Sequence, residues 1–297
     1  MSDTDAEISA PQPRTGLWTL WRQMPLSFRL GSFILIVHLL VAATGPLWAP
    51  YGYSQMGAGP PLSGMSLTHP FGIDQLGRDV FSRVVHGSRI VILLSLSGTF
   101  LGLIAGSIIG LLSGYVGGWV DEAVQRLLEA LISIPFLVLA LIAIAAAGTD
   151  YSGNPVLIVV VVALVYAPRI ARMARAAAID IATRDYVTVA RLRGESAWSV
   201  MRRELLPNAS GVLLVEFALR AGYAPVLIGS LGFLGFGLRP PTPEWGLMIS
   251  ENRALLIIAP STVLGPGLSL ASLVVGLNLF TEGLARVMGR TVKLGAQ

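Results

Sequence analysis

The chain alternates long apolar runs with shorter polar segments, and the lengths of the runs match membrane crossings. An α-helix needs about 20 apolar residues to cross the hydrocarbon layer of a bilayer. Six runs have that length or reach it with uncharged flanking residues: 30–49, 90–114, 127–148, 155–168, 209–238 and 261–281. The pattern therefore predicts an all-α integral membrane protein with six transmembrane helices, of which 155–168 is the shortest.

Composition points to the same class of protein. Of the 297 residues, 54% are hydrophobic and only 13% are charged, whereas soluble domains average about 25% charged residues. The absence of cysteine excludes disulfides, thiol catalysis and cysteine metal sites. The apolar run that follows the polar residues 1–29 is longer than the apolar core of a typical signal peptide, so we expect an uncleaved first helix.

The distribution of basic residues predicts the orientation in the membrane. Eight arginines lie in segment 169–208, and each would cost roughly 3 kcal/mol or more at the bilayer centre, so this segment is expected in water. Fifteen Lys and Arg residues fall in 1–29, 115–126, 169–208 and 282–297, against five in 50–89 and 239–260. Because basic residues concentrate on the cytoplasmic side, we expect both termini to be cytoplasmic.

Within that arginine-rich segment, residues 184–207 have helical periodicity with one break. The pattern predicts one helix over 185–193 and a second over 195–206, separated by Gly194. Helices commonly end on a residue that tolerates positive φ, which suits glycine. Pro207 is expected in the first turn of the following helix, where its missing N–H group costs nothing.

The second of these helices is amphipathic. Trp198, Met201 and Leu205 fall on one face by their spacing, and charged residues occupy the rest. Such a helix either docks on another protein or lies on lipid headgroups with its arginines near phosphates. We favour protein docking, because the first helix is only weakly amphipathic.

Two features of the predicted spans have both a packing and a functional interpretation. Glycines recur every fourth residue in the second span, at Gly98, Gly102, Gly106, Gly110 and Gly114. Such a series lets another helix backbone approach closely, and close packing is preferred here over a gating role.

Glu216 and Arg220 lie four residues apart inside the fifth span, in the favourable order for a helix ion pair. They are either a structural pair or the polar lining of a solute path.

No catalytic chemistry is indicated. The only lysine, Lys293, lacks the glycines and Ser/Thr of a phosphate-binding loop, so the chain has no such loop for nucleotide hydrolysis. The three histidines have no metal-ligand spacing. We therefore expect no catalytic residue, no metal and no cofactor.

Segment 184–207 resembles the coupling loop of binding-protein-dependent ABC importer permeases. That loop has the form E-A-A-x-x-x-G, followed by about nine residues and an apolar residue before proline. The matching residues are Thr188, Val189, Ala190, Gly194, Leu206 and Pro207, with Thr188 and Val189 departing from the leading Glu-Ala. Segments 72–83, 114–121 and 240–246 resemble the dipeptide/oligopeptide/nickel subfamily, and the order of these motifs fits its C-type subunit.

The resemblance implies the fold of a type I ABC importer permease in a bacterial inner membrane. It divides the chain into a cytoplasmic tail (1–29), a first transmembrane helix with an extracytoplasmic segment (30–89), the permease transmembrane domain (90–285) and a second cytoplasmic tail (286–297). The permease would not itself be an enzyme, because separate ATPase subunits would hydrolyse ATP. Implied partners are two ATP-binding subunits, a sister permease in a heterodimer, an extracytoplasmic solute-binding protein and membrane lipid, with no nucleic acid.

The resemblance also assigns roles to residues. Those expected to couple the chain to an ATPase are Asp185, Tyr186, Thr188, Ala190, Arg191, Gly194, Glu195, Trp198, Leu206 and Pro207. Those expected to meet the binding protein are Asp74, Arg78, Asp79, Glu244 and Trp245. Glu216 and Arg220 are candidates for the translocation path.

The expected function is therefore translocation of peptides or a similar small polar solute. Dipeptides, oligopeptides, nickel complexes, glutathione and opine-like compounds remain open as the solute. The alternative is an ion-gradient-driven secondary transporter, which would need ion-coordinating groups at the membrane midplane and often an internal repeat. Here the midplane offers only Glu216 and Arg220, and no repeat is evident.

Overall fold

The computed structural model describes residues 24–294, and every regular element within them is a helix. Most of the predicted N-terminal tail (1–29) lies outside the described residues. The long helices are α2 (Leu26–Trp48), α3 (Val80–Val116), α4 (Gly118–Ser133), α5 (Phe136–Ala147), α6 (Pro155–Ile181), α9 (Leu206–Phe233) and α11 (Ser261–Leu294). Shorter elements are η1 (Thr149–Tyr151), α7 (Asp185–Leu192), α8 (Ala197–Val200), η2 (Met201–Leu205), α10 (Trp245–Asn252) and η3 (Arg253–Leu255).

Six membrane spans are present if one broken helix pair is counted as a span. Within the described residues, five continuous helical stretches are long and apolar enough to cross a membrane. The predicted span 127–148 is instead split into α4 and α5, which meet at an angle of 99°. Pro135 explains the break, because proline lacks an N–H donor and disfavours helical backbone in the residue before it; Ile134 accordingly has extended dihedral angles.

Two helices are longer than the apolar runs that predicted them. Helix α3 begins at Val80, ten residues before the predicted start, and α6 continues to Ile181 beyond the predicted end at Pro168. Helix α6 continues beyond Pro168, and its packing against α3 continues there as well. Ala171, Ala174 and Ala178, which follow Pro168, are all fully buried. The boundary placed between residues 89 and 90 therefore falls within one continuous helix.

Helices α3 and α6 pack closely through the glycine series. An added Cβ on Gly106 would lie 2.6 Å from the backbone oxygen of Ala167, and one on Gly102 would lie 3.2 Å from that of Ala163. At Gly110 a Cβ would collide with the backbone oxygen of Ala171. The packing interpretation of the glycine series is confirmed.

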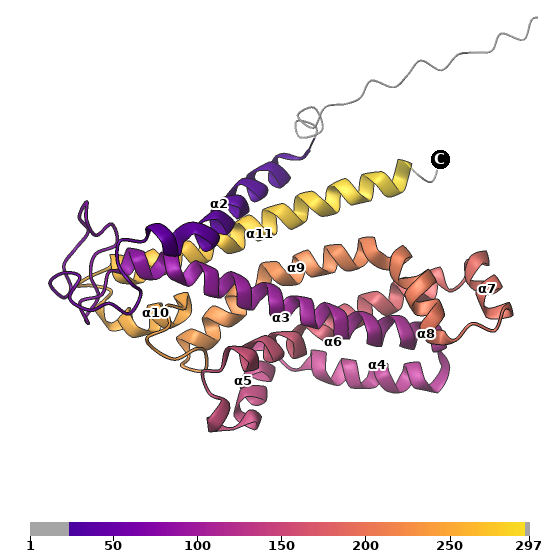
Figure 1. The fold of residues 1–297 in the computed structure, drawn as a ribbon. Coiled ribbons are helices and arrows are strands. Elements are labelled where there is room, and N and C mark those ends of the chain that lie inside the picture. The colour runs from indigo at the N-terminus through magenta and orange to yellow at the C-terminus, as the bar shows by residue number, and fades with distance from the viewer. Residues whose placement is uncertain (1–23, 295–297) are drawn as a thin grey trace, which may run out of the picture.

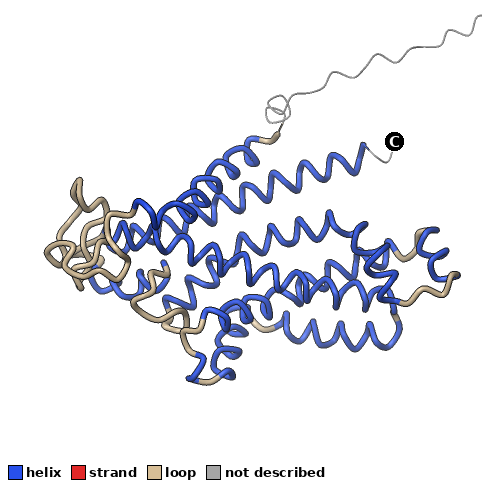
Figure 2. The backbone as a smooth tube through the Cα atoms, in the orientation of Figure 1, coloured by secondary structure: helices blue, strands red, loops and turns tan. Residues whose placement is uncertain are grey.

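The helices form two groups with a distinct end region on each side. Helices α2 and α11 run side by side, while α3, α4, α6 and α9 form a second, larger group (Figure 1). Most loops and α10 gather at one end, and α7 with α8 projects at the opposite end (Figure 2). The start of α2 and the end of α11 point toward the α7 end (Figure 1). We refer to the loop-rich end as the loop end and to the other as the α7 end.

Candidate functional site

The break at Gly194 has the predicted geometry. Gly194 has a φ of +75°, and it follows α7 directly after Arg193. The Gly194 N–H donates to the Arg191 carbonyl (2.9 Å), and the Glu195 N–H donates to the Ala190 carbonyl (3.2 Å). These two bonds form a Schellman motif, which satisfies the last carbonyl groups of α7.

The second predicted helix does not end before the following span. It begins at Ala197, after Ser196 caps it by accepting a hydrogen bond from the Ser199 N–H (3.3 Å). From there α8, η2 and α9 form one continuous helical stretch, 197–233. Pro207 lies in the first turn of α9, as predicted. The middle element, η2, is a π-helical segment, and the backbone stays helical from α8 through it into α9, so α8 is joined to the membrane span without an intervening loop.

One face of this α7–α8 region is buried against the helix bundle. Val187, Ala190, Val200, Met201 and Leu205 pack in one cluster with Leu111 of α3 and with Ala174, Ala178 and Ile181 of α6. The Arg191 guanidinium lies 4.6 Å from the centre of the Tyr115 ring, which adds a cation–π contact to α3. The α7–α8 region is therefore packed directly against α3 and α6.

The opposite face is exposed and includes most of the predicted coupling residues. Asp185, Tyr186, Thr188, Arg191, Gly194, Trp198, Leu206 and Pro207 are exposed, whereas Glu195 is half-buried and Ala190 is buried. Trp198, predicted to share a face with Met201 and Leu205, is 53% exposed, whereas the other two are buried. Leu192, which sequence reasoning missed, is 83% exposed. The sequence signal that could have identified Leu192 is an apolar residue two positions before the glycine that ends α7.

The ion pair predicted inside the fifth span is present. The Glu216 Oε2 atom accepts hydrogen bonds from the Arg220 Nη2 (2.9 Å) and Nε (3.1 Å) atoms. The side chains are 8% and 20% exposed, respectively. Arg220 also lines a cavity of about 200 Å³, which we call the central cavity; its other lining residues are Phe136, Tyr166, Arg169, Tyr223 and Val226.

A second, more polar cavity of about 510 Å³ lies between α4 and α6, and we call it the α4–α6 cavity. It is lined by Gly118, Asp121, Glu122, Gln125, Glu129, Arg172 and Arg175. Arg175 binds Asp121 with two parallel hydrogen bonds, Nε to Oδ1 (2.6 Å) and Nη2 to Oδ2 (2.5 Å). Helix α6 thus contributes arginines to two cavities, Arg169 to the central cavity and Arg172 and Arg175 to the α4–α6 cavity.

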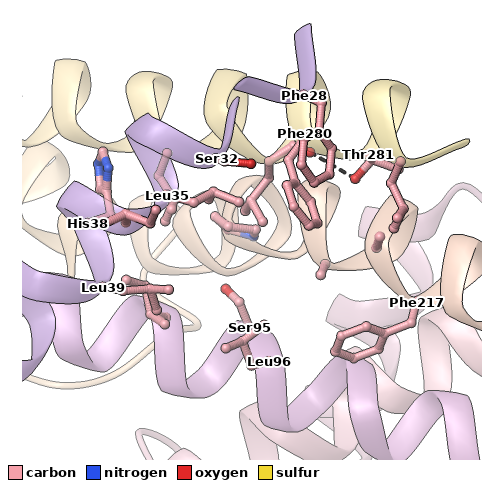
Figure 3. A pocket seen from close by; sticks show the side chains of 18 of the residues that line it. Phe28, Ser32, Leu35, His38, Leu39, Ser95, Leu96, Phe217, Phe280 and Thr281 are labelled. Carbon is pink, nitrogen blue, oxygen red and sulfur yellow. Dashed lines mark hydrogen bonds between the residues drawn. The ribbon is translucent and has the colours of Figure 1, made fainter. Parts of the chain in front are cut away.

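A third cavity, of about 560 Å³, separates the two helix groups. Figure 3 shows its lining, to which α2 contributes Phe28, Leu35 and Leu39, and α9 contributes Phe217. No Asp, Glu, Lys or Arg is among the described residues that line it. Its lining is mainly apolar, with His38 and Ser32 among the polar residues, and it differs in this respect from the other two cavities.

At the loop end, a charge-balanced cluster joins three segments. Arg78 Nε lies 2.6 Å from Asp74 Oδ2, and Arg83 Nη1 lies 3.0 Å from the same oxygen. Both arginines also contact Glu251 Oε2, at 3.1 and 3.0 Å. Two positive and two negative charges offset each other, which a buried cluster requires. The cluster ties the loop before α3 to α10.

The remaining residues predicted to meet a binding protein also have structural contacts. The Asp79 carboxylate caps α3 by accepting a hydrogen bond from the Ser82 N–H (2.7 Å). Glu244 caps α10 by accepting the Gly246 and Leu247 N–H groups, both at 2.8 Å. Burial raises the pKa of Glu244 to about 7. Trp245 Nε1 donates to the Val84 carbonyl (3.0 Å).

All five of these side chains, Asp74, Arg78, Asp79, Glu244 and Trp245, are buried. In this conformation they hold the loop end together, and their contact with a binding protein stays a prediction. Exposed apolar side chains nearby, which sequence reasoning missed, are those of Met56, Met65, Leu67 and Leu76. No group of three or more potential metal ligands exists among the residues that the structure describes.

Comparison with known proteins adds the family context. Residues 86–294 match the model of the family described as the inner membrane component of binding-protein-dependent transport systems. The glutathione transport system permease protein GsiD of Shigella flexneri serotype 5b is 34% identical over 294 residues, covering 96% of this chain and 94% of the relative. The protein of the same name from Salmonella paratyphi A is 35% identical over 287 residues, covering 95% and 91%.

A solved structure supports the fold. A chain of the MetNI methionine ABC transporter, in an inward-facing conformation, aligns with a TM-score of 0.56 and 20% sequence identity. The alignment covers 70% of this chain and 95% of that chain. The two chains therefore share a fold.

Proposed function

The chain belongs to the family of binding-protein-dependent transport system inner membrane components, and from this premise we propose that it is the permease subunit of an ATP-driven importer for peptide-like solutes. The observation that carries the proposal is the continuous helix 197–233, which joins an exposed docking segment to a membrane span. A subunit that only conducts solute does not need such a connection, whereas a subunit that is moved by another protein needs a rigid link between the docking segment and a membrane span.

The docking segment supports a mechanism in which ATP hydrolysis occurs on separate subunits. The exposed face of α7 and α8, including Tyr186, Leu192 and Trp198, would lie against an ATP-binding subunit. Closure of the ATPase pair would displace α8 and α9 together, and the buried cluster would carry α3 and α6 with them. The solute path would then open to one side of the membrane at a time.

The orientation follows from the same segment. The α7 end would be cytoplasmic, because ATP-binding subunits are cytoplasmic and the arginines of α6–α8 favour that side. The start of α2 and the end of α11 point the same way (Figure 1), so both termini would be cytoplasmic. The loop end would then face the solute-binding protein, with Met65, Leu67 and Leu76 as exposed contact candidates and the five buried residues as their support.

The solute and the pore are proposed from the relatives and from the cavities. Relatives named glutathione permeases make a small peptide with free carboxylates the preferred solute class. Glu216 and Arg220 would line the path, since Arg220 reaches the central cavity. A sister permease would face this chain across that path, in a heterodimer.

Uptake in membrane vesicles tests the proposal against the alternative of a secondary transporter. The complete transporter should accumulate a labelled tripeptide only with ATP and the binding protein, and collapse of the proton gradient should leave uptake intact. Leu192→Asp should abolish uptake without lowering the amount of the chain in the membrane, whereas Arg126→Gln, a change at an exposed residue away from α7, should have little effect. Uptake by the chain alone, driven by an ion gradient, would overturn the proposal.

A further inference from the structure

The central cavity carries a positive charge that its own surroundings leave unbalanced. Two arginines line it, Arg169 from α6 and Arg220 from α9. Arg220 is neutralised by Glu216 at 2.9 Å. The Arg169 Nη1 atom donates only to the Val165 carbonyl (3.2 Å), and no carboxylate among residues 24–294 lies within ion-pair distance of it. The cavity therefore has room for one more negative charge.

The position of the two arginines along their helices indicates what the central cavity binds. Arg169 lies about midway along α6 (Pro155–Ile181), and Arg220 lies about midway along α9 (Leu206–Phe233). At a rise of 1.5 Å per residue, both arginines are roughly 20 Å from either end of their helices. An unpaired arginine within a membrane-spanning helix usually faces a solute path or a water-filled cavity, because its charge is costly in lipid.

The other lining residues suit a carboxylate ligand. Tyr166 and Tyr223 each offer a hydroxyl donor, and Tyr223 is 50% exposed, so its side chain is accessible to a passing solute. The planar guanidinium group binds a carboxylate through two parallel hydrogen bonds, which fixes the orientation of the ligand as well as its charge. Phe136 adds an apolar wall for the remainder of the ligand.

We propose that Arg169 and Arg220, together with Tyr166 and Tyr223, form a transit site that binds a carboxylate group of the solute inside the membrane. This inference rests on the importer function proposed above and narrows its substrate class. The permease itself favours anionic peptide-like solutes, beyond the selection made by a binding protein. Arg169 is the residue that decides this preference, because its charge is not already paired.

The α4–α6 cavity carries no excess positive charge. Asp121 is paired with Arg175 and Glu122 with Arg126, which leaves Glu129 to balance Arg172. An anion that leaves the central cavity toward the α7 end is therefore not held a second time. A site that binds in the middle and releases at the end suits transport, which requires weak or transient binding along the path.

Carboxylate and phosphate bind arginine by the same chemistry, so an anionic lipid headgroup is the competing ligand. Headgroups lie at the membrane surface, whereas Arg169 and Arg220 lie at the middle of α6 and α9. The transported solute is therefore the ligand that we assign. The test must still separate the two sources.

The experiment uses the complete transporter with its partner subunits, reconstituted in vesicles of zwitterionic lipid with the binding protein supplied. The probes are glutathione and two tripeptides of one sequence, one with a free C-terminal carboxylate and one with a C-terminal amide. Each probe is compared between permease variants with the same binding protein, so the preference of the binding protein cancels. Uptake and the ATPase activity stimulated by the loaded binding protein are both measured.

Arg169→Gln should lower uptake of glutathione and of the free-carboxylate tripeptide roughly tenfold, and uptake of the amide by less than about twofold, as expected for loss of one charge-assisted hydrogen-bonded contact. Stimulated ATPase activity should persist. Arg286→Gln removes an exposed arginine of α11 that, like its partner Glu282, lines none of these cavities, and it should change uptake of neither probe. Arg169→Lys keeps the charge without the planar fork and should lower carboxylate uptake by a smaller factor.

An equal loss for both tripeptides, or no loss, would overturn the inference. If Arg169→Gln fails to assemble, Tyr223→Phe provides the same comparison at an exposed position, with a carboxylate-specific loss expected. Vesicles with added phosphatidylglycerol test whether a lipid headgroup is the ligand. If this lipid raises uptake only when Arg169 is present, and the preference between the two tripeptides does not change, the site binds lipid and the inference is overturned. Failure of the wild-type transporter to take up any probe with ATP would instead refute the importer function.

Discussion

The Glu216–Arg220 pair allows a quantitative test of how charge is held inside the membrane. Both hydrogen bonds converge on one carboxylate oxygen, at 2.9 and 3.1 Å, and the side chains are 8% and 20% exposed. Removing one member of a fully buried pair costs about 3–5 kcal/mol, because the other charge is left without a partner. Since Arg220 borders a cavity, we expect each single replacement to cost about 2–3 kcal/mol of stability, toward or below the lower end of that range.

Glu216→Gln and Arg220→Gln should differ in what they leave behind. Loss of Glu216 leaves two unpaired arginines on the central cavity, whereas loss of Arg220 leaves a buried carboxyl group that can become neutral by binding a proton. We therefore expect Glu216→Gln to be the more damaging change, both to stability and to uptake. The double variant should be more stable than the sum of the single losses predicts.

The assay is a double-mutant cycle on the purified transporter in lipid nanodiscs, with unfolding followed for wild type, both single variants and the double variant. Independent sites add within about 0.3–0.5 kcal/mol, so a coupling energy above about 1 kcal/mol is decisive for the pair. Additive losses within that scatter would refute the reasoning, because the two residues would then not stabilise each other.

Three further predictions concern the docking segment, the helix packing and the loop end. Gly194→Pro removes the N–H group that donates to the Arg191 carbonyl, and proline cannot adopt the φ of +75° that Gly194 has. Ala190→Arg places a charge in a buried cluster. Both variants should abolish uptake, while the amount of the chain in the membrane, measured by immunoblotting, should be unchanged. Gly110→Ala should lower stability by about 1–3 kcal/mol, because its Cβ meets the α6 backbone, whereas Gly267→Ala, with its nearest atom 4.0 Å away, should be neutral or stabilising; equal thermal shifts for the two would contradict the packing argument. Burial raises the pKa of Glu244 in the folded state from 4.5 to about 7. Between these pH values the folded state binds more protons than the unfolded state, so stability should fall as pH rises from about 4.5 to 7 and then level off. Glu244→Gln should remove this pH dependence, and an unchanged pH profile of thermal unfolding in that variant would assign it to another group.

Local sequence was sufficient for the features that depend on a short stretch of backbone. The apolar runs predicted an all-helical membrane protein, since only helices satisfy every backbone group within one segment in lipid. Gly194 marked the end of α7, because positive φ is a property of a single residue. The glycine series predicted close packing, and the spacing of Glu216 and Arg220 predicted their ion pair, because both follow from the pitch of one helix.

Tertiary structure decided where those features meet and which side chains remain accessible. Helix α6 continues through Pro168 while α3 packs against it, whereas the chain bends by 99° between α4 and α5, where Pro135 lies, so proline alone does not decide where a helix ends. Asp74, Arg78 and Glu244 read as exposed loop residues in the sequence, yet they are buried by partners distant in the chain. Arg169 read as one of eight cytoplasmic arginines, yet it lines a cavity with Arg220 because two helices that are far apart in sequence lie against each other. A linear sequence shows the period of each helix, but burial and charge balance are sums over neighbours that only the folded chain brings together.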